Sequence, residues 1–137
     1  MTPPEPLELE LPAEPVALRE LRARLGGWLR TVGVADQAGR DLVLAMNEAA
    51  TNAVEHAYAG AGTGVVRLRA ALCADRWIQV DVIDHGHWRQ PSGGLPDRGR
   101  GMLIMRGCVD DLGVSGTSSG TTVTLRVGPD ALAPAPT

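Results

Sequence analysis

Glu48 and Asn52 are a pair of residues whose types and spacing could support chemistry. A separation of four places both on one side of a helix, on neighbouring turns. The amide oxygen of Asn52 suits Mg²⁺, which takes its remaining ligands from phosphates and water. A half-buried glutamate beside a metal-bound phosphate is suited to accept a proton from a hydroxyl or water nucleophile. The alternative is that both residues are solvated polar groups on a helix edge.

Asp84 ends an apolar, strand-like segment and is followed by His85, Gly86 and His87. A carboxylate at a buried strand end needs a hydrogen-bond donor, and the exocyclic amino group of a purine is a suitable one. Gly86 leaves room for a ring to lie against the backbone. Asp84 could instead simply open a turn, as aspartate often does. The two histidines have no evident third metal ligand, so we interpret them as exposed loop residues.

A glycine-rich segment, Arg98-Gly99-Arg100-Gly101-Met102, precedes a short helix that we predict over Met102 to Val109. The free N–H groups at a helix N-terminus form an anion site. Either Arg98 or Arg100 could reach phosphate oxygens, and the sequence does not decide between them. The segment is not a dinucleotide-binding fingerprint, because no strand directly precedes it and the third glycine is missing.

Composition excludes several classes of protein. All 13 basic residues are arginine, which rules out a Walker A lysine, a eukaryotic-kinase strand lysine and a Schiff-base lysine. The net charge of -3 gives no broad attraction for nucleic acid or an anionic membrane surface, so we expect neither partner. No signal-peptide pattern is present, and no apolar run approaches the ~20 residues of a membrane span, so we expect a cytoplasmic protein. Cys73 and Cys108 lack metal-site spacing and are predicted to be reduced thiols.

Two amphipathic helices must position the first pair of residues. Apolar residues three and four apart predict one helix over residues 18–32, with Gly26-Gly27 weakening its middle. The second helix is predicted to start near Asp36, a good N-cap residue, and to run to about Tyr58. Its apolar stripe is expected to face a sheet, and consists of Leu42, Met46, Ala49, Ala53 and Ala57.

Two β-hairpins are predicted after these helices. Residues 64–70 and 76–84 alternate apolar and polar side chains and are joined by a short link. Residues 112–115 and 121–127 flank a turn-rich stretch and form the second hairpin. Helices segregated from hairpins predict an α+β fold, a two-layer α/β sandwich with the helices on one face of a mostly antiparallel, mixed sheet.

The domain boundaries follow from the prolines near each end of the chain. We expect residues 1–15 and 128–137 to be disordered, proline-rich tails without a long helix or a central strand. Residues 16–127 then form a single domain, which is long enough to bury one hydrophobic core.

Four segments occur in a specific order: 48–52 on a helix, 84–86 after a strand, 99–101 opening a helix and 120–123 opening a last strand. This order resembles the Bergerat-fold ATPases, the superfamily of gyrase, Hsp90, histidine kinases and MutL. Within it, residues 45–58 and 99–105 resemble the bacterial anti-sigma-factor serine kinases. The resemblance covers roughly Leu18 to Val127.

The resemblance implies ATP and Mg²⁺ as cofactors and assigns roles on both sides of the site. Glu48 matches the family's catalytic base, and Asn52 matches its Mg²⁺ ligand. Asp84 matches the adenine-binding aspartate, with Gly86 beside the ring.

The lid and the last strand carry the remaining matches. Gly99 and Gly101 match the mobile lid that closes on the phosphates, and Met102 continues that motif. Thr121 matches a threonine that supports adenine through the aspartate and water. Thr122 competes for this role, because adjacent strand residues face opposite ways and the sequence does not show which faces inward.

The activity implied by the resemblance is that of a serine-protein kinase. It would phosphorylate an anti-anti-sigma (STAS-domain) protein and otherwise sequester a sigma factor. A nucleotide-switched regulatory binding module with little or no phosphotransfer is the alternative, against which Glu48 argues, because pure binding needs no base. A metabolic ATPase is a third possibility, opposed by the absence of a separate substrate domain. The sequence does not fix the oligomeric state, although the resemblance suggests a homodimer.

Overall fold

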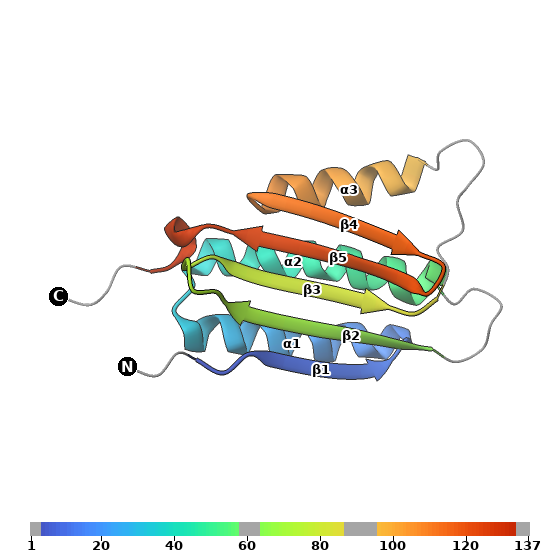
Figure 1. The fold of residues 1–137 in the computed structure, drawn as a ribbon, viewed down its shortest axis with the longest axis horizontal. Helices are drawn as coiled ribbons and strands as arrows, with labels where there is room; N and C mark the ends of the chain where they lie inside the picture. The colour runs from blue at the N-terminus through green and yellow to red at the C-terminus, as the bar shows by residue number, and fades with distance from the viewer. Residues whose placement is uncertain (1–3, 58–63, 87–95, 134–137) are drawn as a thin grey trace.

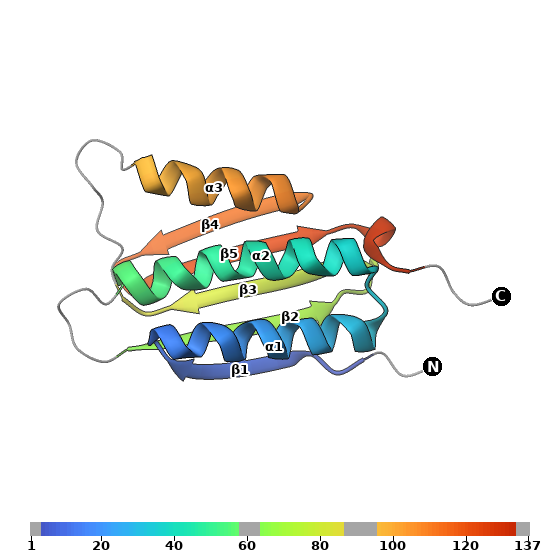
Figure 2. The ribbon, with the colours of Figure 1, turned by 180° about the vertical axis from the view of Figure 1, so that it is seen from behind.

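The computed structural model describes residues 4–57, 64–86 and 96–133, and for residues 56–57 and 96–100 it describes the backbone only. These residues form two layers, a five-stranded sheet with three helices on one face (Figures 1 and 2). The predicted two-layer α+β sandwich is therefore confirmed. All four strand pairings are antiparallel, so the described sheet is antiparallel throughout rather than mixed.

The strands stand in the order β1-β2-β3-β5-β4 within the sheet. Both predicted hairpins are present. The first hairpin consists of β2 (Val65–Leu72) and β3 (Ile78–Asp84), and the second consists of β4 (Asp111–Thr117) and β5 (Gly120–Val127). An additional first strand, β1, spans Leu7–Pro12.

The helices cover the sheet as the apolar periodicity predicts. Helix α1 (Pro15–Val32) buries Leu21, Leu25 and Leu29, and it continues through the glycine pair in its middle. Helix α2 (Asp36–Asn52) buries Leu42, Met46 and Ala49, among others, against the sheet. A π-helical turn, η1 (Ala53–Ala57), continues α2, and Tyr58 lies outside the described residues. Helix α3 (Pro96–Cys108) lies beside β4 (Figure 1).

The start of α2 differs from the prediction by one residue. Ala35, in an extended conformation, is the N-cap, and no side chain caps the helix. Asp36 lies instead in the first turn, where its negative charge interacts favourably with the helix dipole. Gly33 ends α1 with φ 96°, and its backbone N–H donates to the Leu29 and Arg30 carbonyls. This left-handed turn sets the position at which the second helix begins.

The expectation of a disordered tail over residues 1–15 is wrong, because β1 pairs with β2 at the edge of the sheet. Leucines at positions 7, 9 and 11 alternate with glutamates, which is the strand period. Glu8 forms ion pairs with Arg67 (3.5 Å) and Arg69 (3.1 Å) on β2. Proline is tolerated on such an edge strand because one side of its backbone has no ladder to complete.

The end of the chain is also ordered beyond the predicted boundary at Val127. A 3₁₀ turn, η2 (Pro129–Ala131), follows β5, and Leu132 forms a bridge with Val34. Residues 134–137 lie outside the described part. Within the described residues, no helix is both long and apolar enough to cross a membrane.

Candidate functional site

The topology brings the predicted site segments to one end of the molecule. Strand β3 ends at Asp84 where β5 begins, because the two strands are antiparallel neighbours. Figure 1 shows that α2 also ends, and α3 begins, at this end of the sheet. Residues that are far apart in the sequence are thereby gathered into two groups, one on the strands and one on the helices.

The strand group is centred on Asp84, an acidic residue that is only 2% exposed. The Gly86 backbone N–H donates a hydrogen bond to its Oδ1 at 3.1 Å. Thr121, 6% exposed, stands directly opposite Asp84 in the register of β3 and β5. A buried carboxylate and a buried hydroxyl therefore share one face of the sheet, the face that the helices cover.

The register also separates the two candidate threonines. Thr121 lies on the same face as Val123 and Leu125, which are buried in the core. Thr122 pairs with Ile83 and points to the opposite, uncovered face of the sheet. Of the two, Thr121 is the one on the face of Asp84.

Gly120 is a residue of this group that was not among the predicted site residues. Its φ is 143°, a conformation that side chains rarely adopt, and an added Cβ would collide with the Asp84 carbonyl oxygen. That Cβ would also lie 2.8 Å from the Cα of His85. The sequence signal was a glycine directly before Thr121. Its absence of a side chain is what lets β5 approach the end of β3 so closely.

The helix group consists of Glu48 and Asn52 on α2 and Gly101 on α3. Glu48 and Asn52 are both half-buried, and Asn52 is the last residue of α2. Gly101 is buried, and a Cβ added to it would lie 3.7 Å from Glu48 Oε2 and 3.8 Å from Asn52 Nδ2. The predicted carboxylate, amide and lid glycine therefore lie close together, and a Cβ at Gly101 would be in ordinary van der Waals contact with the other two.

The position of the glycines within α3 corrects one prediction. The helix begins at Pro96, not at Met102, so Gly101 is its sixth residue. Unpartnered N–H groups belong to the first turn of a helix, so the expected anion site is not at Gly101 in this conformation. Gly99 is also helical, whereas the side chains of Arg98 and Arg100 lie outside the described residues. Met102 is half-buried and packs against the core.

Cys108, the last residue of α3, lies close enough to α2 for acidic side chains of that helix to affect the pKa of its thiol. Burial raises the pKa of its thiol, and the carboxylates of Asp41 and Glu48 raise it further. Both effects disfavour the thiolate, as expected for a desolvated group near negative charge. No group of three or more histidine, cysteine or acidic side chains suited to a metal occurs in the described residues.

The fold and these two groups define an α+β domain of the ATPase type. The chain belongs to the family of histidine kinase-like ATPase domains, whose model matches residues 11–127.

Several curated proteins that are similar to the chain along most of its length are serine-protein kinases. The serine-protein kinase RsbW of Bacillus licheniformis is 31% identical over 134 residues, covering 87% of this chain and 82% of the relative. RsbW of Bacillus subtilis strain 168 shows the same identity and coverage.

A solved structure that contains an RsbW domain is also similar to this chain. The crystal structure of the RsbU and RsbW domains of a Mycobacterium tuberculosis protein aligns with a TM-score of 0.76 and 31% identity, covering 92% of this chain. The chain spans 33% of that larger protein. A histidine kinase domain from Erythrobacter litoralis, 22% identical with a TM-score of 0.58, shares the fold.

Proposed function

We propose that this chain is an ATP-dependent serine-protein kinase of the anti-sigma class. The observation that carries the proposal is that two groups lie at the same end of the sheet: a buried Asp84 and Thr121, and the Glu48–Asn52 pair beside Gly101. The first group offers polar contacts in an apolar setting, as a purine requires. The second offers a proton acceptor and an oxygen ligand, as phosphoryl transfer requires.

Adenine is assigned to the strand group. The Asp84 carboxylate, oriented by the Gly86 N–H, would accept a hydrogen bond from the exocyclic amino group of the base. Thr121 lies opposite it and would support the same base directly or through water. A guanine ring presents an acceptor oxygen at this position, so the site should select against GTP.

The phosphates and Mg²⁺ are assigned to the helix group. An amide oxygen next to a carboxylate is a donor set that suits Mg²⁺, which commonly uses one or two protein ligands. Gly101, without a side chain, leaves the space beside this pair open to a phosphate oxygen. Asn52 would hold the ion, which when bound neutralises phosphate charge. Gly99 and Gly101 supply the lid, and either Arg98 or Arg100 contacts phosphate.

Glu48 is assigned the role of base. As the serine oxygen of the substrate attacks the γ-phosphorus, Glu48 accepts the hydroxyl proton, and the bond from that phosphorus to the β-γ bridging oxygen breaks. The products are phosphoserine and ADP. The half-buried position of Glu48 limits competing water while keeping it within reach of a docked substrate.

The partners follow from this assignment. The protein whose serine accepts the phosphoryl group is an anti-anti-sigma (STAS-domain) protein. A sigma factor is the partner that is bound without being phosphorylated. The kinase acts as a homodimer in the cytoplasm, and its nucleotide state decides which partner it binds.

The decisive experiment incubates the protein with labelled ATP, Mg²⁺ and its STAS partner. Wild type should transfer phosphate to a serine. The Glu48→Gln variant should bind ATP normally but transfer phosphate about 10²-fold more slowly. Transfer at the wild-type rate by Glu48→Gln would remove the base role. Tight ATP binding without any transfer by wild type would identify a regulatory binding module instead.

Asn52→Ala tests the metal assignment on the same helix. This change removes an oxygen ligand, so ATP affinity measured by calorimetry should fall, and raising Mg²⁺ should restore part of it. Glu48→Gln should show no such Mg²⁺ rescue. An Asn52→Ala affinity that ignores Mg²⁺ would place the ion elsewhere.

A further inference from the structure

Three of the four serines of this chain lie on the hairpin that β4 and β5 form. Ser115 is on β4, and Ser118 and Ser119 make the two-residue turn between the strands. The fourth, Ser92, lies outside the described residues. Figure 1 shows the turn at the end of the sheet where α2 also ends, which is the end of the proposed nucleotide site. The chain therefore presents serines at the same end of the molecule as its proposed serine-kinase site.

The two turn serines differ in what their hydroxyls contact. Ser119 Oγ lies 2.8 Å from Thr117 Oγ1, and the Ser119 N–H donates to that same oxygen at 3.1 Å. Ser118 is exposed, and within the part of the chain that the structure describes its hydroxyl has no hydrogen-bond partner. The Ser118 hydroxyl can therefore act as a nucleophile without first breaking a contact within the turn.

The apex of the turn is also the part of the hairpin that another active site can admit. Transfer requires the serine oxygen to lie in line with the γ-phosphorus, roughly 3–3.5 Å from it. Ser115 stands opposite Thr122 in the ladder of β4 and β5, so it lies on a flat sheet surface that cannot enter a half-buried site. Ser118 stands on a loop beyond the last paired residues, Thr117 and Gly120. Of the described serines, Ser118 combines an unengaged hydroxyl with a projecting position.

The turn is held in place relative to the active site of its own chain. Gly120, directly after the turn, has φ 143°, and an added Cβ there would collide with the Asp84 carbonyl oxygen. The hairpin is thus packed tightly against the end of β3 in the sheet layer, whereas Glu48 belongs to the helix layer (Figure 2). Because this packing leaves the turn little freedom to fold over the helices, we expect Ser118 to reach Glu48 of a second copy.

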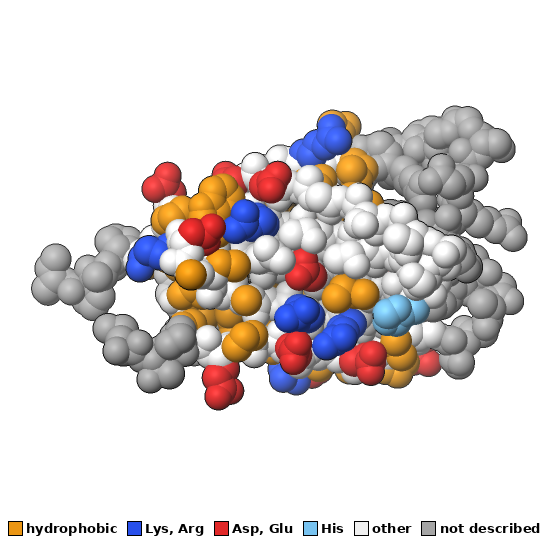
Figure 3. All heavy atoms as spheres, in the orientation of Figure 1, with side chains coloured by type: hydrophobic (Ala, Val, Ile, Leu, Met, Phe, Trp, Pro, Cys, Tyr) orange, Lys and Arg blue, Asp and Glu red, His pale blue; other side chains and the backbone are white. Residues whose placement is uncertain are grey.

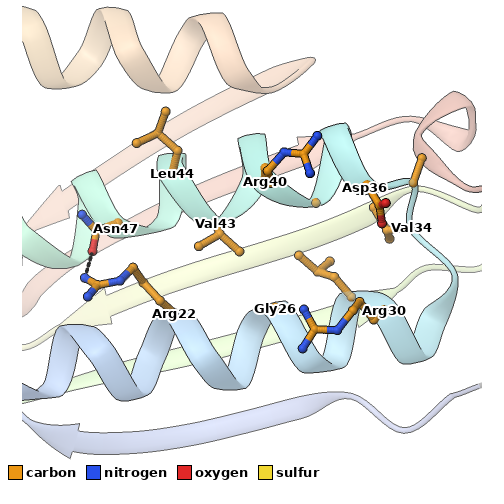
Figure 4. Close-up of a pocket in the computed structure, with 12 residues that line it drawn as sticks. Arg22, Gly26, Arg30, Val34, Asp36, Arg40, Val43, Leu44 and Asn47 are labelled. Carbon is orange, nitrogen blue, oxygen red and sulfur yellow. Dashed lines mark hydrogen bonds between the residues drawn. The ribbon is translucent and has the colours of Figure 1, made fainter.

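The part of the hairpin next to the turn carries no charge. Residues 112–122 include no acidic or basic side chain. On the uncovered face of the sheet, the surface over β4 and β5 near the turn is neither charged nor hydrophobic (Figure 3). Arg22, Arg30 and Arg40 line a groove between α1 and α2 instead (Figure 4). The hairpin therefore offers a phosphate on Ser118 no positive partner, and its charge of about −1.5 to −2 would lie at the end of the sheet where ATP is proposed to bind.

We propose that Ser118 is a phosphorylation site that a second copy of this chain modifies, and that the phosphate lowers the ATP affinity of the modified copy. The proposal rests on the proposed function, because the reaction is the proposed kinase reaction with a different acceptor. Ser118 Oγ attacks the γ-phosphorus of ATP held by the second copy, and the new O–P bond forms as the bond to the β-γ bridging oxygen breaks. ADP leaves with that electron pair, and Glu48 of the second copy accepts the hydroxyl proton.

The first experiment incubates the full chain with ATP and Mg²⁺ alone and locates phosphate by mass spectrometry of its peptides. Phosphate is expected on Ser118, and Ser118→Ala should lose it. Ser115→Ala and Ser119→Ala should keep it within about twofold, because surface substitutions away from the acceptor have small effects. Phosphate on another residue only, or none while the STAS protein is still phosphorylated, would overturn the proposal. Absence of transfer to either acceptor would instead refute the proposed function.

A complementation test decides whether the reaction takes place between two copies. Ser118→Ala keeps the base but lacks the acceptor, and Glu48→Gln keeps the acceptor but lacks the base. Glu48→Gln alone should be modified about 10²-fold more slowly than wild type, and adding Ser118→Ala should restore phosphate on the Glu48→Gln chain. Ser118→Ala should still phosphorylate the STAS protein at the wild-type rate. A mixture no more active than Glu48→Gln alone would overturn transfer between copies.

The effect on ATP is tested with two matched charge variants and calorimetry. Ser118→Glu places a negative charge on the turn and should weaken ATP about threefold or more, with a smaller effect at high salt. Ser115→Glu adds the same charge roughly 10 Å farther along the strand, so ATP affinity should change by less than about 1.5-fold. Equal ATP affinity in Ser118→Glu and wild type would overturn the proposed loss of affinity.

Discussion

The strand group and the helix group of the proposed nucleotide site differ in how closely their elements approach each other. Around Asp84 and Thr121, the backbones of β3 and β5 approach so closely that Gly120 has no room for a Cβ. Around Glu48 and Asn52, the facing residue is also a glycine, but a Cβ on Gly101 would make only ordinary contacts. In the strand group, the close approach of two backbones fixes the positions of the residues. In the helix group, the packing of α3 on α2 sets the distance between the residues.

This difference fits the roles that we propose for the two groups. A base-binding surface gains affinity when it is formed in advance, because no ordering cost is incurred on binding. A phosphate-binding surface has to admit a nucleotide, close for transfer and release ADP, which requires an element that moves. Gly101 on α3 approaches Glu48 and Asn52 less closely than Gly120 approaches Asp84, so we expect such a movement in α3 rather than in the strands.

The largest effect is expected at Gly120. Alanine there must adopt φ near 143° and displace the backbone at Asp84, so Gly120→Ala should lower the free energy of unfolding by about 3 kcal/mol or more and abolish ATP binding. Gly116→Ala is the control on the facing strand, where an added Cβ would meet Thr121 Oγ1 at 3.8 Å. It should change stability by less than about 0.5 kcal/mol in denaturant unfolding. Equal stability of both variants would contradict the steric argument.

The next largest effect concerns binding of the adenine ring. Asp84→Asn exchanges an acceptor-only carboxylate for an amide, so ATP affinity by calorimetry should fall about tenfold to 100-fold while inorganic phosphate binds as before. Asp81→Asn changes the same strand on its other face, where Asp81 accepts a hydrogen bond from Thr124 at 2.7 Å. That variant should retain ATP affinity. Unchanged ATP binding in Asp84→Asn would remove the purine role.

A smaller effect is expected at Gly101 and sharpens the contrast with Gly120. Gly101→Ala should stabilise α3 by about 0.5–1 kcal/mol, because alanine favours a helix over glycine. The same change should still weaken ATP binding by about 1 kcal/mol, because the added methyl group occupies space beside Glu48 and Asn52. Gly107→Ala on the same helix has open space around its added Cβ and should show only the stabilisation. Identical ATP affinity in the two variants would argue that phosphate does not bind here.

The smallest effect is a change in thiol reactivity. Burial and the carboxylates of Asp41 and Glu48 raise the pKa of Cys108, so its alkylation should be slow and should accelerate only at high pH. Glu48→Gln removes one negative charge, which favours the thiolate, so the pKa should fall and the rate profile should move to lower pH. Iodoacetamide kinetics in a Cys73→Ser background measure this. A shift toward higher pH would show that Glu48 does not face Cys108.

Much of the fold was predictable because local patterns agreed with it. Alternation along β2, β3 and β5 and the three- and four-residue steps along α1 and α2 each reflect one face turned to the core. Strand β1 was missed because its neighbouring prolines outweighed a short alternation of leucine and glutamate. Proline excludes a central strand but not an edge strand, and only the complete sheet shows which position a strand occupies.

For the site, the sequence by itself determined the chemical types and their spacing: a carboxylate and an amide one helical turn apart, an aspartate at a strand end, and glycines before Met102 and Thr121. These are local properties, set by the period of each element. The tertiary structure decided which residues meet. It placed Thr121 rather than Thr122 opposite Asp84 through the register of β3 and β5, and it set Gly101 against Glu48 through the packing of α3 on α2. Register and helix packing depend on contacts between segments far apart in the chain, which no local pattern encodes.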